Sequence, residues 1–290
     1  MRLLVTGNEM DNAFAVVETG GTKDRPIGFH CHKEAHDVFL CVKGVRNVWA
    51  NDEARSMGPG DFASAPPEEF FRFIGEPYSG PLFPTNDNRN PFEVLIPKLM
   101  AATEKFDMIP VREKKSFDPQ PWNGTENKLP GKCKNGGYFL KEGEGEKTVI
   151  GGTVVRAMCR REETNDRFSI YDILGSSIHA SKAFSKEVRF ADTHHAIYTV
   201  DGALKLTIGG EEVIALAGET TFVPAGTKFK VGFETVYARA YVLANGGGFG
   251  ELLNGLGSVY ESVAVPNEVE RSWDEGKLKE LEAEIGDLSF

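Results

Sequence analysis

Three of the chain's six histidines, His30, His32 and His36, lie within seven residues of one another, and Asp37 follows directly. On a β-strand, side chains alternate between faces, so His30 and His32 would point the same way and Cys31 the opposite way. Two imidazoles that face a protein interior are costly to bury unless something binds them. Two histidines and a carboxylate can hold a first-row metal and leave coordination positions open. The spacing therefore predicts a metal site formed by His30, His32 and Asp37.

Other side chains near this trio could act in catalysis or bind an aromatic ligand. Glu69 lies two positions before Phe71, so on a regular strand both would share one face. We expect Asp37 and Glu69 to be the acids that act in catalysis, because carboxylates can transfer protons. The aromatic side chains that would stack against a ligand are Phe39, Trp49, Phe71 and Phe73.

The elements that position these residues belong to a unit that occurs twice in the chain. Shifted by 158 residues, segment 36–73 aligns with segment 194–231 without a gap. The identical pairs are His36 and His194, Val42 and Val200, Gly44 and Gly202, Glu53 and Glu211, Gly60 and Gly218, Pro66 and Pro224, and Phe71 and Phe229. Most of these are turn or core positions, which indicates an internal duplication.

The second copy lacks the predicted metal ligands. Val188 and Phe190 occupy the places of the paired histidines, His195 that of the acid, and Phe229 that of Phe71. We therefore expect no metal in this copy. His195 is either a hydrogen-bonded core histidine or a catalytic proton-transfer group, because burial lowers the pKa of an imidazole and keeps it neutral near pH 7. The paired position of His36 and His194 indicates a residue that serves a turn.

Both copies contain short β-branched and aromatic runs, interrupted by turn residues about every 8–12 positions, which predicts an all-β fold with an antiparallel sandwich or barrel in each half. We expect an N-terminal barrel domain with a helical extension over 1–115, a linker over 116–148, a degenerate second barrel over 149–265 and a helical tail over 266–290. Leu278, Leu281, Ile285 and Leu288 form the apolar stripe of a final helix. The glycine-rich segment 245–255 is predicted to be a loop.

The composition limits the partners and the compartment. With 290 residues, 40% of them hydrophobic and 26% charged, the chain can form an ordinary soluble core, and no apolar run suggests a membrane partner. The net charge of −10 argues against nucleic acid, because phosphates would be repelled. The first residues lack a secretory h-region, and the four cysteines form no CxxC pair, so we expect a cytoplasmic protein with free thiols.

The segment HCHKEAHD at 30–37, followed by Gly44, resembles the first motif of the cupin superfamily. The segments GPGDFASAPPEEFFRF at 58–73 and LAGETTFVPAGTKFKV at 216–231 resemble its second motif. Two copies resemble a bicupin, and FFRFIGEPYSGPLF with HHAIYTVDGALKLTIGG is similar to the fungal quercetin 2,3-dioxygenase-like family. The resemblance implies two jelly-roll cupin β-barrels with a few short helices, including one at the C-terminus.

The same resemblance implies cleavage of a flavonol or related enol by oxygen, at a metal held by three histidines and a glutamate. His30 and His32 match the paired histidines, Asp37 falls at the glutamate, and Phe71 stands where that family has its last histidine. The implied cofactor is one divalent metal, Fe, Mn, Ni, Cu or Zn, in the N-terminal cupin.

Three functions follow as hypotheses. The first is a metal-dependent cupin dioxygenase acting on a flavonol-like, phenolic or polyketide small molecule. The second is an isomerase, cyclase or decarboxylase that acts on an aromatic or polyketide intermediate without oxygen chemistry, because both copies lack the second-motif histidine. The third is a bicupin that binds a ligand without turnover. Barrel-edge strands and the final helix would allow a homodimer.

Overall fold

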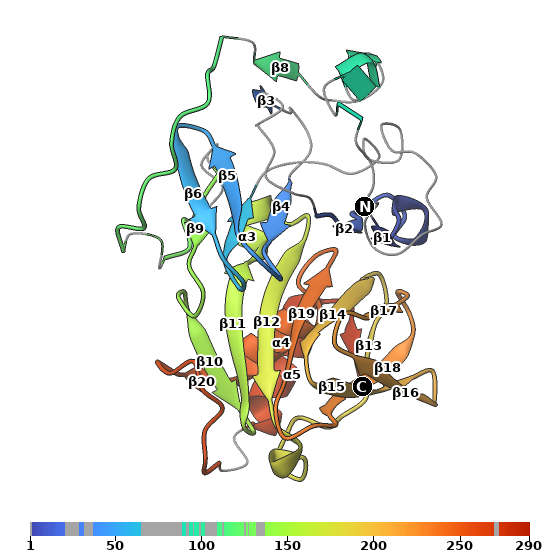
Figure 1. The fold of residues 1–290 in the computed structure, drawn as a ribbon. Coiled ribbons are helices and arrows are strands. Elements are labelled where there is room, and N and C mark those ends of the chain that lie inside the picture. The colour runs from blue at the N-terminus through green and yellow to red at the C-terminus, as the bar shows by residue number, and fades with distance from the viewer. Residues whose placement is uncertain are drawn as a thin grey trace.

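In the computed structural model, the two related halves of the chain are both built from antiparallel strands. The structure describes residues 2–20, 29–31, 37–64, 89–90, 93–94, 96–98, 100–101, 109–111, 113–124, 126, 128–131, 137–269 and 273–290. The strands of the first copy lie together at the top of Figure 1, and those of the second copy lie below them. The prediction of an all-β fold with two jelly-roll-type units and few helices is confirmed.

The second copy consists of two sheets that enclose the largest hydrophobic core. One sheet has the strand order β17-β14-β19-β12-β11-β10-β20, and the other has the order β16-β15-β18-β13-β21. Their bounds are β10 (Lys147–Ile150), β11 (Thr153–Cys159), β12 (Ser169–Gly175), β13 (Val188–Phe190), β14 (His195–Asp201), β15 (Ala203–Ile208), β16 (Glu211–Leu216), β17 (Thr220–Val223), β18 (Lys228–Phe233), β19 (Ala238–Ala244), β20 (Ser258–Val259) and β21 (Leu288–Ser289). Apolar side chains from both sheets, such as Ile197 and Leu206, interdigitate in this core.

The described strands of the first copy are shorter and form three small sheets, β4-β7-β9, β5-β6 and β3-β8. Their bounds are β3 (Phe29–Cys31), β4 (Val38–Leu40), β5 (Arg46–Ala50), β6 (Glu53–Met57), β7 (Phe62–Ser64), β8 (Ile109–Val111) and β9 (Phe139–Leu140). Their core contains Val48, Met57 and Phe139. A separate cluster, including Phe62 from this copy and Tyr241 from the other, packs the two copies together.

The registers of the two copies confirm the duplication. Phe39 pairs with Ala63 across β4 and β7, and 158 positions later Ile197 pairs with Thr221 across β14 and β17. The shared turn glycines also have the same backbone conformation, with φ of +87° at both Gly60 and Gly218. Because L-residues rarely adopt this left-handed region, glycine is retained at this turn in both copies.

The N-terminal segment packs on the second copy. Its first strand is β1 (Arg2–Val5), which is followed by the 3-10 helix η1 (Gly7–Glu9) and by β2 (Val16–Glu18). Val5 and Met10 are buried in one cluster with Ala196 of β14. Within the predicted linker over 116–148, β9 pairs with β7 of the first copy. The domain boundaries given in the sequence analysis stay a prediction. The contacts show that the N-terminal segment packs on the second copy and that β9 pairs with the first.

Two predictions about helices need correction. The segment predicted as a loop forms helix α4 (Gly248–Leu256), because its buried Phe249, Leu252, Leu253 and Leu256 follow helical spacing despite the glycines. The final helix α5 (Glu275–Ile285) does pack on the second core, but Leu288 lies beyond it in β21, opposite Phe190.

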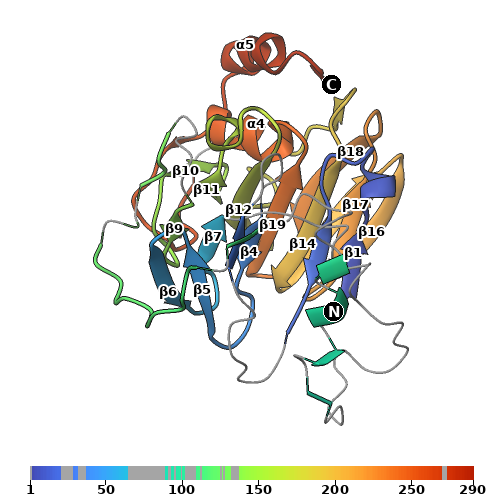
Figure 2. The same ribbon diagram turned by 90° about the horizontal axis from the view of Figure 1, so that it is seen from above.

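The helices cover only part of the strand surface. Figure 2 shows α4 and α5 on one side of the second copy and β1 on the other. The short helical elements α3 (Arg161–Thr164) and η2 (Ser177–His179) connect strands of that copy, and the described residues between 93 and 101 are helical.

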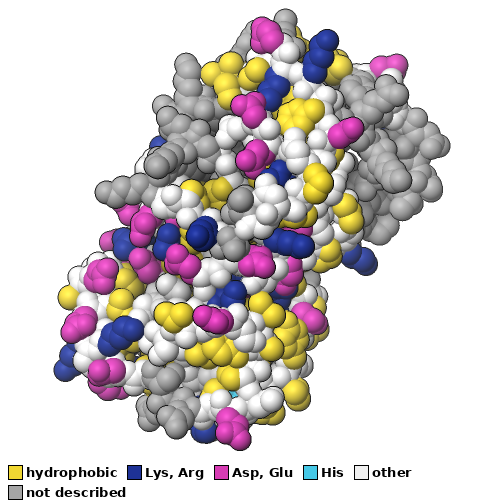
Figure 3. All heavy atoms as spheres, turned by 90° about the vertical axis from the view of Figure 1, so that its left-hand side faces the viewer, with side chains coloured by type: hydrophobic (Ala, Val, Ile, Leu, Met, Phe, Trp, Pro, Cys, Tyr) yellow, Lys and Arg dark blue, Asp and Glu magenta, His cyan; other side chains and the backbone are white. Residues whose placement is uncertain are grey.

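Among the described residues, no helix combines the length and apolar character that crossing a membrane requires. On the face shown in Figure 3, acidic and basic side chains are interspersed.

The two equivalent glycines allow a matched test of the packing between the copies. A Cβ at Gly218 would meet nothing within 4 Å, whereas one at Gly60 would lie 1.5 Å from Oε2 of Glu142. We expect Gly218→Ala to lower the free energy of unfolding by about 1–2 kcal/mol through its backbone conformation alone. Gly60→Ala should cost more, because Glu142 must also move. Urea denaturation of both variants measures the difference, and equal losses would contradict it.

Candidate functional site

The structure describes part of the predicted metal site. His30 lies in β3 opposite Pro110 of β8, and its side chain is exposed. Desolvation by the surrounding protein nevertheless lowers the pKa of His30, which favours the neutral imidazole that binds metals. The predicted site residues His32, Glu69, Phe71 and Phe73 lie outside the described residues.

Asp37 directly precedes β4, on the inner side of the first copy. Phe39 and Cys41, two and four positions later, both pack against the core of this copy. Because side chains alternate along an extended chain, Asp37 shares their face. Burial raises the pKa of Asp37 to about 8, and within the described part of the chain no hydrogen bond or ion pair reaches its carboxyl group. Among the described residues, Asp37 is therefore a desolvated acid without the partner that its charged form needs.

In the second copy, the equivalent positions form one buried cluster. Val188, Phe190, His195 and Phe229 each expose at most 1% of their surface. The His195 ring centroid lies 4.9 Å from that of Phe190 and 5.0 Å from that of Phe229. Val188 pairs with Phe229 across β13 and β18. The duplicated unit thus brings these four positions to one place between its two sheets.

His195 itself is sealed in this cluster. Its Nε2 accepts a hydrogen bond from the backbone N–H of Phe249 at 3.0 Å. A Cβ at Gly248 would lie 2.5 Å from that nitrogen, so glycine lets α4 approach the ring. Burial, with a smaller contribution from His194, lowers the pKa of His195 to about 3. Among the described residues, Nδ1 of His195 has no hydrogen-bond partner. The Thr193 backbone, which would raise the pKa of His195, therefore has only a small effect.

The depressed pKa of His195 predicts a specific loss of stability in acid. The unfolded state binds a proton near pH 6.5 and the folded state only near pH 3, so stability is full above pH 6.5 and falls as the pH decreases through this window. We expect the free energy of unfolding of the wild type to lose up to about 1.4 kcal/mol per pH unit more than that of His195→Gln. Urea denaturation between pH 7 and pH 4 measures this, and parallel curves would contradict it.

The remaining predicted residues divide between the inner and outer faces of the first copy. Phe39 packs on the inner core, as a ligand-binding side chain there would. Trp49 lies between Val48 and Ala50, which both belong to that core, so its ring is on the opposite face of β5. Its Nε1 donates to the carbonyl oxygen of Phe117 at 2.9 Å. We therefore leave Trp49 out of the candidate ligand site.

His194 serves a turn, as its paired position predicts. Its Nδ1 accepts from the backbone N–H of Ala225 at 3.2 Å, and its ring stacks on Phe222 at 5.8 Å.

A surface cavity of about 540 Å³ elsewhere in the second copy contains none of the predicted site residues; it is lined by Ile178, His179, Lys182, Asn267, Glu268 and Val269.

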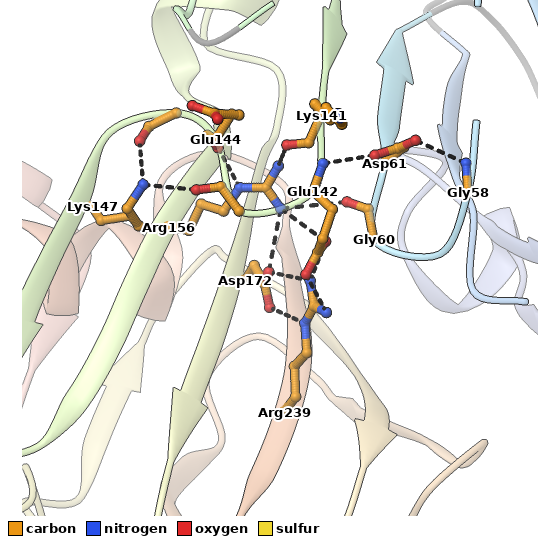
Figure 4. Close-up of polar contacts among 12 residues, drawn as sticks. Gly58, Gly60, Asp61, Lys141, Glu142, Glu144, Lys147, Arg156, Asp172 and Arg239 are labelled. Carbon is orange, nitrogen blue, oxygen red and sulfur yellow. Dashed lines mark hydrogen bonds and ion pairs between the residues drawn. The ribbon is translucent and has the colours of Figure 1, made fainter. Parts of the chain in front are cut away.

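A charged network that was not predicted joins the two copies (Figure 4). Asp172 accepts from Nη2 of Arg239 at 2.6 Å and lies 3.5 Å from Nη1 of Arg156. Arg156 also donates to the carbonyl oxygen of Gly60 at 3.4 Å, and Arg239 pairs with Glu142 at 2.8 Å. The sequence does contain a feature that points to this network. Each of the apolar runs TVVRAMC, SIYDILG and ARAYVLA contains one charged residue, and the three charges are positive, negative and positive.

No metal site is visible among the described residues, where no group of three or more His, Cys, Asp or Glu side chains is placed to hold an ion. The predicted trio includes His32, which lies outside those residues. The chemistry of the described members is compatible with a metal, because one is an imidazole with a lowered pKa and the other a carboxyl group that no other described residue pairs with.

Comparison with known proteins identifies one curated relative and several structural neighbours. No protein-family model matches the chain. Quercetin 2,3-dioxygenase from Bacillus subtilis (strain 168) is 28% identical over 153 residues, which are 53% of this chain and 44% of that protein. The chain thus spans less than half the length of this relative.

Two solved structures that resemble the chain each cover less than half of it. Ectoine synthase from P. lautus is 15% identical with a TM-score of 0.31, over 42% of this chain and 86% of that chain. KdgF from Halomonas sp. is 13% identical with a TM-score of 0.30, over 35% of this chain and 84% of that chain. At these values, the likeness carries no argument about activity.

Proposed function

We propose that the chain, which resembles quercetin 2,3-dioxygenase-like proteins of the cupin superfamily, is a metal-dependent dioxygenase. The proposed substrate is a flavonol-like or related phenolic or polyketide small molecule. One metal ion would be held in the first copy by His30, His32 and Asp37.

The observation that carries this proposal is the buried cluster in the second copy. The register of β4 with β7 agrees with that of β14 with β17, so we expect positions that converge in one copy to converge in the other. In the described residues β3 pairs with β8, whereas its equivalent β13 pairs with β18 and β21. The pairs of equivalent positions are Val188 and His30, Phe190 and His32, His195 and Asp37, and Phe229 and Phe71. The cluster therefore supports a common site for the two histidines and the acid.

The environment of Asp37 also fits a bound cation. A desolvated carboxyl group is unfavourable when charged, no described residue pairs with that of Asp37, and a metal ion would supply positive charge there. When bound, the metal would act as a Lewis acid that favours the ionised form of an enol or phenol oxygen. Phe39 would pack against the substrate ring and exclude water from it.

One observation favours the alternative of an isomerase, cyclase or decarboxylase. An acid with a pKa of about 8 can exchange a proton near neutral pH, so Asp37 could transfer protons without a metal. His195 does not contribute to this alternative, because its ring is fully buried and its Nε2 is bound by the Phe249 amide.

Oxygen uptake tests the proposal against this alternative. Protein reloaded separately with Fe(II), Mn(II), Ni(II) or Cu(II) should consume oxygen with at least one flavonol-type substrate, and EDTA should abolish the uptake. Turnover that survives EDTA and needs no oxygen would instead establish the alternative. Ligand-induced thermal stabilisation without any turnover would indicate a binding protein and contradict both.

A further inference from the structure

The outer edge of β16 carries backbone groups that face away from the barrel. β15 and β16 are joined by a two-residue turn at Gly209 and Gly210, which makes Ile208 and Glu211 the closing pair of the hairpin. In an antiparallel ladder, alternate residues bond to the partner strand, so Val213 and the other odd-numbered residues bond to β15. The N–H and C=O groups of Glu212 and Ile214 therefore point outward.

In the first copy, the same edge is covered by the chain itself. Ala54 and Ser56 of β6 are the equivalents of Glu212 and Ile214. The Ala54 N–H donates to Oε1 of Gln120 at 2.8 Å, and the Gln120 N–H donates to the Ala54 carbonyl at 2.9 Å. Nε1 of Trp122 donates to the Ser56 carbonyl at 3.2 Å. An extended segment thus satisfies this edge.

Among the described residues, no hydrogen bond reaches the outward backbone groups of Glu212 and Ile214. The side chains beside this edge are also less covered in the second copy than in the first. Arg55 is 2% exposed beneath its covering segment, whereas its equivalent Val213 is 39% exposed. Ile214 and Leu216 are also exposed, at 45% and 54%. β16 has no proline, lysine or bulge, and its only charged residues, Glu211 and Glu212, lie at the hairpin end of the strand.

We propose that β16 pairs antiparallel with β16 of a second copy of this chain. With Val213 on the two-fold axis, Glu212 lies opposite Ile214 of the second copy, and Ile214 lies opposite Glu212 of the second copy. Both pairs are then of the hydrogen-bonded type, so all four outward groups on each strand are satisfied. The pairing uses the groups that Gln120 and Trp122 satisfy in the first copy.

The charges along this edge are complementary under the same symmetry. Within one copy, Lys205 lies beside Ile214 across β15 and β16, and its Nζ lies 2.9 Å from Oε1 of Glu212. Self-pairing places Glu212 of the second copy on the far side of Ile214. The two rows that pass through Glu212 and Ile214 each contain one lysine and one glutamate, so this pairing places no like charges opposite one another in them. This inference is independent of the proposed activity.

The test is the mass in solution. The 31.8 kDa chain should scatter light as a dimer of twice that mass, over a concentration series. Ile214→Pro should be monomeric, because proline removes an outward N–H without breaking a bond to β15. Ile214→Thr keeps that N–H and should remain dimeric, and both variants should keep the circular dichroism of the wild type.

Three outcomes would overturn the proposal. A monomeric wild type would leave β16 for another occupant, such as an extended peptide of a different protein. A dimeric, folded Ile214→Pro variant would place the interface elsewhere. If Ile214→Thr dissociates as fully as Ile214→Pro, side-chain packing rather than strand pairing holds the dimer.

Discussion

Replacing Asp172 with alanine is expected to lower the free energy of unfolding by about 3–5 kcal/mol, because it leaves buried positive charge uncompensated. Asp172 is 1% exposed and lies between the guanidinium groups of Arg156 and Arg239 (Figure 4). Arg156 is itself 2% exposed and spans the contact to Gly60 of the first copy. Urea or thermal denaturation, followed by circular dichroism, measures the loss.

Glu142→Ala is the matched control for this variant. Glu142 pairs with the same Arg239, but 43% of its side chain is exposed, so water can replace the lost partner. We expect its removal to cost less than about 1 kcal/mol. If the two variants were equally stable, the network would not act as a buried charge cluster that holds the copies together.

Replacing His30 with alanine is expected to weaken metal binding by at least about 100-fold, because even residues that only support a ligand cost 10–100-fold. The expected loss follows from the proposed ligand set, in which His30 is one of three protein donors. Isothermal titration of metal-free protein with Mn(II), Ni(II) or Fe(II) measures the affinity, and oxygen uptake should fall with it.

Cys31→Ser is the matched control for His30→Ala. Cys31 is the next residue on β3, it is exposed, and its side chain points to the opposite face. Its replacement should leave metal affinity unchanged. If His30→Ala and Cys31→Ser bound metal equally well, His30 would not be a ligand.

The duplication made much of the architecture predictable. A shift of 158 residues aligned turn glycines and core positions, and the structure keeps the same strand registers and the same φ at Gly60 and Gly218. Helix α4 could not be recognised as easily, because its glycines lower helix propensity while tertiary packing of Phe249 and Leu252 stabilises it. Leu288 left the predicted helix because β13 offers it a strand partner.

The candidate site was predictable only in part. Strand alternation and residue chemistry identify His30, His32 and Asp37 as a set, and these assignments stay predictions. Alternation alone could not assign the outer face to Trp49, because Val48, Trp49 and Ala50 are all apolar and only the packing shows that Val48 and Ala50 face the core. The partners of Asp172 and the burial of His195 also depend on contacts between segments distant in sequence.

Elemental analysis of freshly purified protein, prepared without chelators, shows whether the first copy holds a metal ion. We expect one first-row metal ion per chain in the wild type and in Cys31→Ser, and none in the folded double variant His30→Ala/His32→Ala. A wild type without metal that also fails to bind Fe(II), Mn(II), Ni(II), Cu(II) or Zn(II), or a double variant that retains a full equivalent, would contradict the proposed site.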